Sequence, residues 1–362
     1  MDARPLDPLS LSSSAYSFKS LKTREVKNVF NNDEWLGQIV EDIFDPDREI
    51  VDPHHHLWPN PQIQYDLEHL LKDTSSGHNV VQTVFMECGA AYRTEGPPEF
   101  YPVGETEFVA AAAARSAELD GQATFAGIIS HANMMGDHLD TVIDAHEEAA
   151  KGLFRGIRHS GAWDPHPEAL SIPGRGEPGL YARDDFRRGV ARLGERGLSF
   201  DTWMIHHQIP EYTDLAKAVP DTTMIFDHFG MPIGVGPYAD QKEEIFARWK
   251  DDVADLSECP NVYAKLGGLA MPDMGFGWNL RDEPPSSDEF VTAQSRWYDH
   301  AIACFGPERC MFESNFPVDR QSISYRTLWN GLKKIAANYP DADQDLMFSG
   351  VARQVYRLSS TV

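Results

Sequence analysis

The chain has 362 residues, of which 41% are hydrophobic and 24% are charged, a composition that fits a folded globular protein and argues against disorder. A formal net charge of −24 argues against nucleic acid or an anionic membrane surface as the main partner. The four cysteines lack the spacing of a zinc site, and we see no secretory leader or long apolar run, so we expect a reduced, cytoplasmic setting and no membrane span.

Residues 1–46 contain clusters of Ser, Asp and Asn with one predicted short helix at 32–43, and we interpret them as an extension of a single domain at 47–358. From there, apolar strands alternate with helices. Strands are predicted at 49–51, 80–88, 124–130, 153–159, 198–204, 223–226, 262–266 and 309–312. Helices are predicted at 65–73, 105–119, 139–151, 184–196, 211–218 and 240–256. This alternation predicts an α/β fold, a (β/α)8 TIM barrel; an open doubly wound sheet is the alternative, disfavoured because no GxGxxG follows the first strand.

The segment IVDPHHHLW at 50–58 stands at the end of the first predicted strand. Side chains alternate along a strand, so His54 and His56 should share a face with Asp52, and His55 should point away. Two imidazoles at this spacing suit a divalent metal, a polarised carbonyl or proton transfer. Taken alone, the pair is equally well explained as a polar strand end.

Other ionisable residues also stand where strands end. In a barrel these ends meet at one mouth, where the chemistry takes place. We therefore expect an active site there. Besides the first strand, the residues concerned are Glu87, His207, Asp227, His228 and Glu313.

With these residues placed, the chain resembles the amidohydrolase superfamily, and within it the lactonase-like amidohydrolase 2 group of TIM-barrel hydrolases. The motifs are DPHHHLW, HHQIP, FDHFGMP and SNFPVD, and the resemblance covers 47–358. It implies active-site roles for His54, His56, His207 and His228. Some members hold divalent ions, whereas several in the lactonase branch work without metal. We therefore expect either no cofactor, which is favoured, or one Zn or Mn ion on His54, His56 and His228.

Asn315 departs from the family pattern, which has at this position an Asp that takes a proton from the attacking water. An amide can hold a water molecule but cannot accept its proton. Glu313, Glu87 or a neutral histidine could be the base instead. An ion pair between Glu313 and Arg309 or another cation is the structural alternative.

Arg158 resembles a family position that binds acidic substrate groups, and its guanidinium suits a carboxylate. An ion pair at the barrel rim is the alternative. Phe276 and Trp278, in the long loop at 271–285, are predicted to form an apolar lid, with Tyr92 on the other side. Aromatic side chains in such loops also serve simply for packing.

Three functions remain open. The first is hydrolysis of a lactone, carboxylated or sugar-derived. The second is a non-hydrolytic lyase, such as a decarboxylase of an aromatic or unsaturated acid, which needs no base for water. The third is a catalytically silent barrel retained for binding. In each case the expected partner is a small molecule, and a homo-oligomer is compatible with the sequence.

Overall fold

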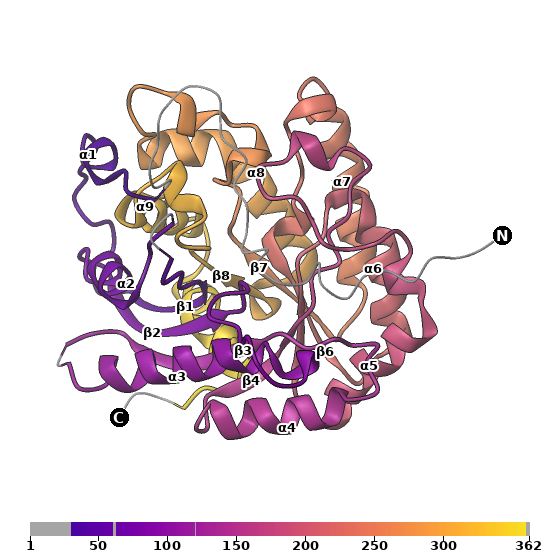
Figure 1. The fold of residues 1–362 in the computed structure, drawn as a ribbon. Coiled ribbons are helices and arrows are strands. Elements are labelled where there is room, and N and C mark those ends of the chain that lie inside the picture. Colours follow the sequence, from indigo (N-terminus) through magenta and orange to yellow (C-terminus); the bar gives the residue numbers. More distant parts are fainter. Residues whose placement is uncertain (1–29, 61–62, 120, 360–362) are drawn as a thin grey trace.

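The computed structural model describes residues 30–60, 63–119 and 121–359 (Figure 1). Eight strands pair in parallel in the order β1 to β8, which confirms the predicted (β/α)8 barrel. A parallel bridge between His55 and Phe316 connects the two ends of the sheet. The strands are β1 (Glu49–His55), β2 (Asn79–Met86), β3 (Thr124–Ser130), β4 (Phe154–Arg158), β5 (Ser199–Thr202), β6 (Thr223–Phe226), β7 (Val262–Leu266) and β8 (Cys310–Phe312).

Helices surround the strands (Figure 1). Six of them lie close to their predicted ranges: α2 (Leu67–Thr74), α3 (Val103–Ser116), α4 (Leu139–Ala149), α5 (Asp184–Glu195), α6 (Ile209–Ala218) and α7 (Lys242–Ser257). Two further long helices, α8 (Ser287–Phe305) and α9 (Tyr325–Ala336), lie outside the predicted ranges. The start of α8 carries a capping box in which the side chains of Ser286 and Glu289 each accept a hydrogen bond from the backbone of the other.

The C-terminal helix α11 (Val351–Val355) packs against the starts of the strands. Arg353 forms an ion pair with Glu49, the first residue of β1. Apolar side chains of α11 join strand residues such as Val51 and Met311 in one buried cluster. The predicted active-site residues therefore lie at the other end of the barrel, where the strands end.

The described part of the extension packs on the barrel. The ring of Phe30 stacks on Trp58 at 5.6 Å, and Arg320 donates to the Phe30 carbonyl. The predicted helix is shorter than expected, since α1 (Asp33–Leu36) ends at Gly37. A short helix α10 (Asp341–Asp345) precedes a single π-helical turn before α11. Residues 1–29 lie outside the described part.

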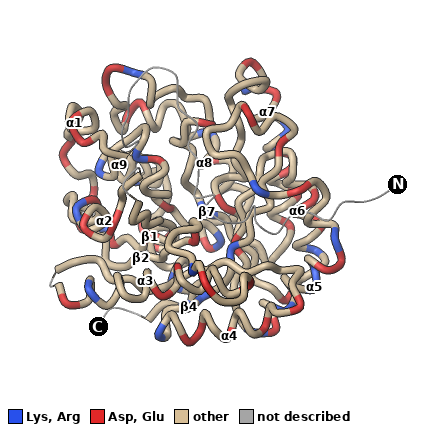
Figure 2. Tube along the Cα trace, viewed as in Figure 1, with Lys and Arg blue, Asp and Glu red and all other residues tan. Residues whose placement is uncertain are grey.

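Positions of charged residues of both signs are spread along the outer helices and loops (Figure 2). Within the described residues, no helix combines the length and the apolar character needed to span a membrane.

Candidate active site

The ends of β1, β6 and β8 bring four predicted site residues together. The alternation along β1 is as predicted: the Nε2 atoms of His54 and His56 are 3.2 Å apart, whereas His55 packs against two phenylalanine rings outside the barrel interior. His228 follows β6, and its ring centroid is 4.5 Å from that of His54. Glu313 follows β8 and lies between these two histidines.

The Glu313 carboxylate bridges two imidazoles. Its Oε1 lies 2.7 Å from His228 Nδ1, and its Oε2 lies 2.8 Å from His54 Nδ1. Two glycines at the end of β7 make room for this contact. A Cβ on Gly267 would lie 2.4 Å from Glu313 Cγ, and one on Gly268 would lie 2.6 Å from His228 Nδ1.

Burial keeps the three imidazoles neutral. Burial and the nearby Lys265 cation hold the pKa of His54 well below its usual value, and burial and Arg158 do the same for His56. Burial lowers the pKa of His228 to about 3. In contrast, burial raises the pKa of Glu313 to about 8, so this carboxyl group holds a proton readily.

One carboxylate oxygen of this group lacks a hydrogen-bond donor of good geometry among the described residues. His56 Nδ1 lies 2.8 Å from the Met86 carbonyl, so Nδ1 is the donor and Nε2 remains an acceptor. His54 Nε2 lies 3.2 Å from His56 Nε2 and 3.4 Å from a guanidinium nitrogen of Arg158, and His54 Nδ1 lies 3.5 Å from the Lys265 ammonium nitrogen. Glu313 Oε2 lies 2.8 Å from the same Nδ1 and receives no hydrogen bond of good geometry from the described residues. A proton or a metal ion would give this oxygen a partner.

The same atoms fit a divalent metal. His54, His228 and Glu313 each offer one ligand atom, and the three atoms lie within 4.8 Å of one another. Two imidazoles and one carboxylate form a known ligand set of catalytic zinc. This set differs from the predicted one, which had His56 in place of Glu313 and which remains a prediction. His56 differs because its Nδ1 is bonded to the Met86 carbonyl and its Nε2 pairs with His54.

Arg158 lies beside the cluster and is paired with Glu87. Its Nε donates to Glu87 Oε1 at 2.9 Å, and a second guanidinium nitrogen donates to the Glu87 carbonyl. Burial alone would raise the pKa of Glu87, but Arg158 holds it below its usual value. The rim ion pair that we considered for Arg158 is therefore present. An ionised Glu87 engaged in this way is a weaker candidate base than Glu313.

Asn315 faces the same space from the β8 loop. Its Nδ2 donates to Asp319 Oδ2 at 2.8 Å, and its backbone has a φ of 53°, unusual for a residue other than glycine. Arg309 does not pair with Glu313; instead, it donates to backbone carbonyls, among them that of Phe305. The predicted pairing of Glu313 with Arg309 is therefore wrong, and the Glu313 carboxylate instead lies against two histidines.

A second charged group lies beneath the first, and Asp227 is the one member of it that was predicted as a site residue. Lys265 Nζ from β7 is 2.9 Å from Asp201 Oδ1 and 3.4 Å from Asp227 Oδ1. Tyr356 donates to the same Asp201 oxygen at 2.6 Å. Burial alone would lower the pKa of Lys265, but the two carboxylates raise it, so the ammonium stays charged. The sequence signal that could have indicated this group is a charged residue inside each of two apolar segments, 198–204 and 262–266.

A cavity that is open to solvent borders the upper group. Its wall combines apolar rings and chains with one guanidinium, two imidazoles and an amide, a mixture that suits a small polar molecule. The lining residues are His56, Trp58, Arg158, Ile172, Trp203, His228, Met271, Asn315 and Val318.

His207 is not brought into this group. β5 ends at Thr202, and the one-turn helix His206–Gln208 carries His207 into the outer loops. There its Nε2 lies 3.2 Å from Asp164 Oδ2, and a quarter of its side chain is exposed.

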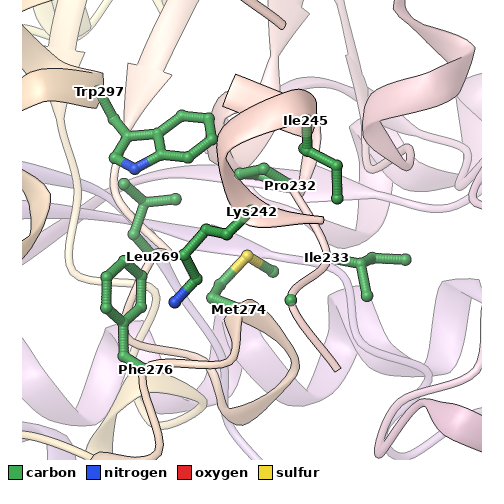
Figure 3. A pocket seen from close by; sticks show the side chains of 9 residues that line it. Pro232, Ile233, Lys242, Ile245, Leu269, Met274, Phe276 and Trp297 are labelled. Carbon is green, nitrogen blue, oxygen red and sulfur yellow. The ribbon is translucent and has the colours of Figure 1, made fainter. Parts of the chain in front are cut away.

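The predicted aromatic lid also lies elsewhere. Phe276 lines a separate, mainly apolar cavity, where Lys242 Nζ lies 4.4 Å from its ring centroid (Figure 3). Trp278 stacks on Phe276 and packs near Phe290. Tyr92 is half-buried after β2 and is not among the residues that line the main cavity. Packing with neighbouring loops, rather than proximity to the mouth, decides where these rings lie.

Comparison with known proteins identifies a matching family and two relatives by sequence. The family described as amidohydrolase matches residues 51–358. An uncharacterised protein of Sinorhizobium fredii is 29% identical over 334 residues, which are 86% of this chain and 99% of that protein. An L-fucono-1,5-lactonase of Burkholderia multivorans is 27% identical over 175 residues, which are 48% of this chain and 56% of that protein.

Among solved structures, an amidohydrolase of Burkholderia multivorans with bound zinc has a TM-score of 0.66 at 20% identity. The alignment covers 86% of this chain and 99% of that one. At this identity the likeness supports the barrel fold.

Proposed function

This chain belongs to the amidohydrolase family, and on that premise we propose that it hydrolyses a lactone, sugar-derived or carboxylated. The observation that carries the proposal is Glu313, which is held between two neutral imidazoles beside a cavity with a mixed polar and apolar lining. The partial match to a lactonase supports the same class of substrate.

We assign the proton transfer to Glu313. Its Oε2 has no hydrogen-bond donor of good geometry among the described residues, and its raised pKa suits a group that takes and returns a proton near neutral pH. Arg158 lines the cavity and carries a fixed positive charge. It is placed to stabilise the oxygen on which negative charge develops, or to bind a carboxylate of the substrate.

We further propose that His54, His228 and Glu313 hold one divalent ion, zinc or manganese. Such an ion, when bound, polarises a carbonyl and lowers the pKa of water. In the metal-free protein, the same Glu313 would instead act as the base. Elemental analysis of the purified protein, with His54→Ala as the control, distinguishes these two forms.

The test of function is a panel of five- and six-membered aldonolactones and pyrone carboxylates, with acid release followed in a pH-indicator assay. We expect turnover with at least one lactone, and a severe loss in Glu313→Gln. If ligands bind without any turnover, the barrel is a binding protein, and the hydrolase proposal fails.

Decarboxylation is the second candidate, and Asn315 favours it. Its amide cannot take a proton from water, whereas loss of carbon dioxide requires no such step. Carbon dioxide release from aromatic or unsaturated acids, without acid release from lactones, would favour this reaction.

The charge of −24 supports a free small molecule as the partner, with neither nucleic acid nor membrane involved. A cytoplasmic location, a homo-oligomer and the division into 1–46 and 47–358 remain predictions.

A further inference from the structure

Asp273 connects three loops above the barrel. It lies in the loop after β7, and its side chain is buried. Its Oδ1 accepts hydrogen bonds from the Ser171 amide at 2.9 Å and from the Ser171 hydroxyl at 2.7 Å, and its Oδ2 accepts from the Ile172 amide at 3.3 Å. These donors lie in the loop after β4. The Asp273 carbonyl accepts from the Gly234 amide at 2.9 Å, in the loop after β6.

This junction adjoins the wall of the main cavity. Ile172, whose amide Asp273 holds, lines that cavity from the β4 loop. Met271, two residues before Asp273, lines it from the β7 loop. The relative positions of these two apolar side chains therefore depend on one carboxylate.

The loops approach as closely as their backbones allow. A Cβ on Gly234 would lie 2.4 Å from the Met274 carbonyl oxygen, and one on Gly275 would lie 2.1 Å from the Gly234 carbonyl oxygen. Asp273 forms no ion pair among the described residues. Hydrogen-bond donors of the loop after β4 instead satisfy its carboxylate. A buried carboxylate satisfied only in this way fixes the geometry of its partners.

We propose that Asp273 is a positioning residue that sets the spacing between Ile172 and Met271, and thereby the size of the ring that the cavity accepts. This inference rests on the proposed lactone hydrolysis and deepens it. Asp273 touches no reacting atom; it acts through the two wall residues.

The kinetic test compares a five-membered with a six-membered lactone. In Asp273→Ala, we expect KM for the preferred ring to rise about 10-fold and kcat to change less than about 3-fold, because the wall contributes to binding rather than to chemistry. The preference between rings should fall at least about 5-fold. Asp273→Asn should be intermediate, since its single amide oxygen can retain Ser171 but not Ile172. Ser171→Ala, which removes one hydroxyl, tests the contact if the alanine variant at 273 does not fold.

Glu211→Gln is the matched control. Glu211 Oε1 accepts from the amides of Tyr181 and Ala182, at the far end of the same connection, and these residues do not line the described cavity. The control should leave the ring preference unchanged. An equal loss of kcat/KM for both rings in the Asp273 variants would overturn the proposal.

Hydrogen exchange tests the loop junction without any substrate. In Asp273→Ala, the amides of Ser171 and Ile172 should exchange at least about 10-fold faster than in the wild type, and Glu211→Gln should leave them unchanged. If no lactone is turned over but exchange accelerates, the proposed function fails and the junction stands. Unchanged exchange of these two amides would overturn the positioning role.

Discussion

Two buried charged groups lie one above the other in this barrel, and they are built differently. In the lower group, Lys265 supplies a fixed cation for Asp201 and Asp227, and Tyr356 adds a hydrogen bond to Asp201. In the upper group, Glu313 lies between two neutral imidazoles and forms no ion pair with a lysine or arginine of the described residues. Only 3.5 Å separates Lys265 Nζ from His54 Nδ1, where the groups meet.

This difference distinguishes a group that stabilises the fold from a group that can take part in a reaction. In the lower group Lys265 lies between two carboxylates, and none of the members of this group lines the described cavity, so we expect it to support the fold. Acceptors without a hydrogen-bond donor of good geometry occur in both groups, at Asp227 in the lower group and at Glu313 Oε2 in the upper group, but only the upper group has residues that line the cavity. An incompletely satisfied polar group in a cavity is the usual mark of a reactive site.

The largest expected effect on activity comes from Glu313→Gln. We expect turnover to fall by about 10²- to 10⁴-fold, because the amide cannot take a proton. The free energy of unfolding should change little, since the substitution keeps the shape and removes a buried ionisable group. Rates on the responsive substrate and urea unfolding together measure this, and a near-normal rate would remove Glu313 from the mechanism.

Lys265→Met should have the largest effect on stability. It leaves two buried carboxylates without their cation, at an expected cost of about 3–5 kcal/mol in the free energy of unfolding at pH 7. Urea unfolding measures the loss. Lys217→Met, at an exposed position on α6, should change stability by less than about 0.5 kcal/mol. Equal stability of the Lys265 variant and the wild type would show that the lower group is not structural.

The acid sensitivity of stability should distinguish the upper group. The pKa of His228 is about 3 in the folded chain, below the 6.5 of an ordinary histidine. Between these values the unfolded chain binds a proton that the folded chain does not, so stability is full above pH 6.5 and falls as the pH drops. The slope from this residue is at most about 1.4 kcal/mol per pH unit.

Urea unfolding at pH 7, 6 and 5 tests this. His228→Asn should lose less stability on acidification than the wild type does, by up to about 2 kcal/mol over these two pH units. Identical slopes in both proteins would show that His228 is already charged in the fold.

His207→Ala should have the smallest effect. This histidine pairs with Asp164 outside the cavity lining, so we expect turnover to stay within about 10-fold of the wild-type rate. The same kinetic assay measures it. A loss comparable to that of Glu313→Gln would return His207 to the catalytic group.

Strand geometry explains why part of the upper group was predictable. Alternation along β1 orients His54 and His56, and barrel closure brings the ends of β6 and β8 to them. The residues concerned follow directly from strands, where few conformations are open to the chain. His228 and Glu313 could therefore be placed near the first strand from the sequence pattern.

The rest depended on contacts between distant segments. His207 lies outside the upper group because β5 ends at Thr202 and His207 lies in a one-turn helix rather than in an extended strand. Phe276 and Trp278 are positioned by packing between loops. The pairing of Lys265 with Asp201 joins β7 to β5 across the barrel interior, and no local pattern shows it.

The stack of Phe30 on Trp58 affects how the protein can be handled. Trp58 lines the cavity, and its ring is stacked against Phe30, which precedes the barrel. Trimming the chain to begin at residue 47, a common step before crystallisation, would uncover that indole. Kinetic constants from the shortened and the full-length protein should therefore be treated as those of two different enzymes.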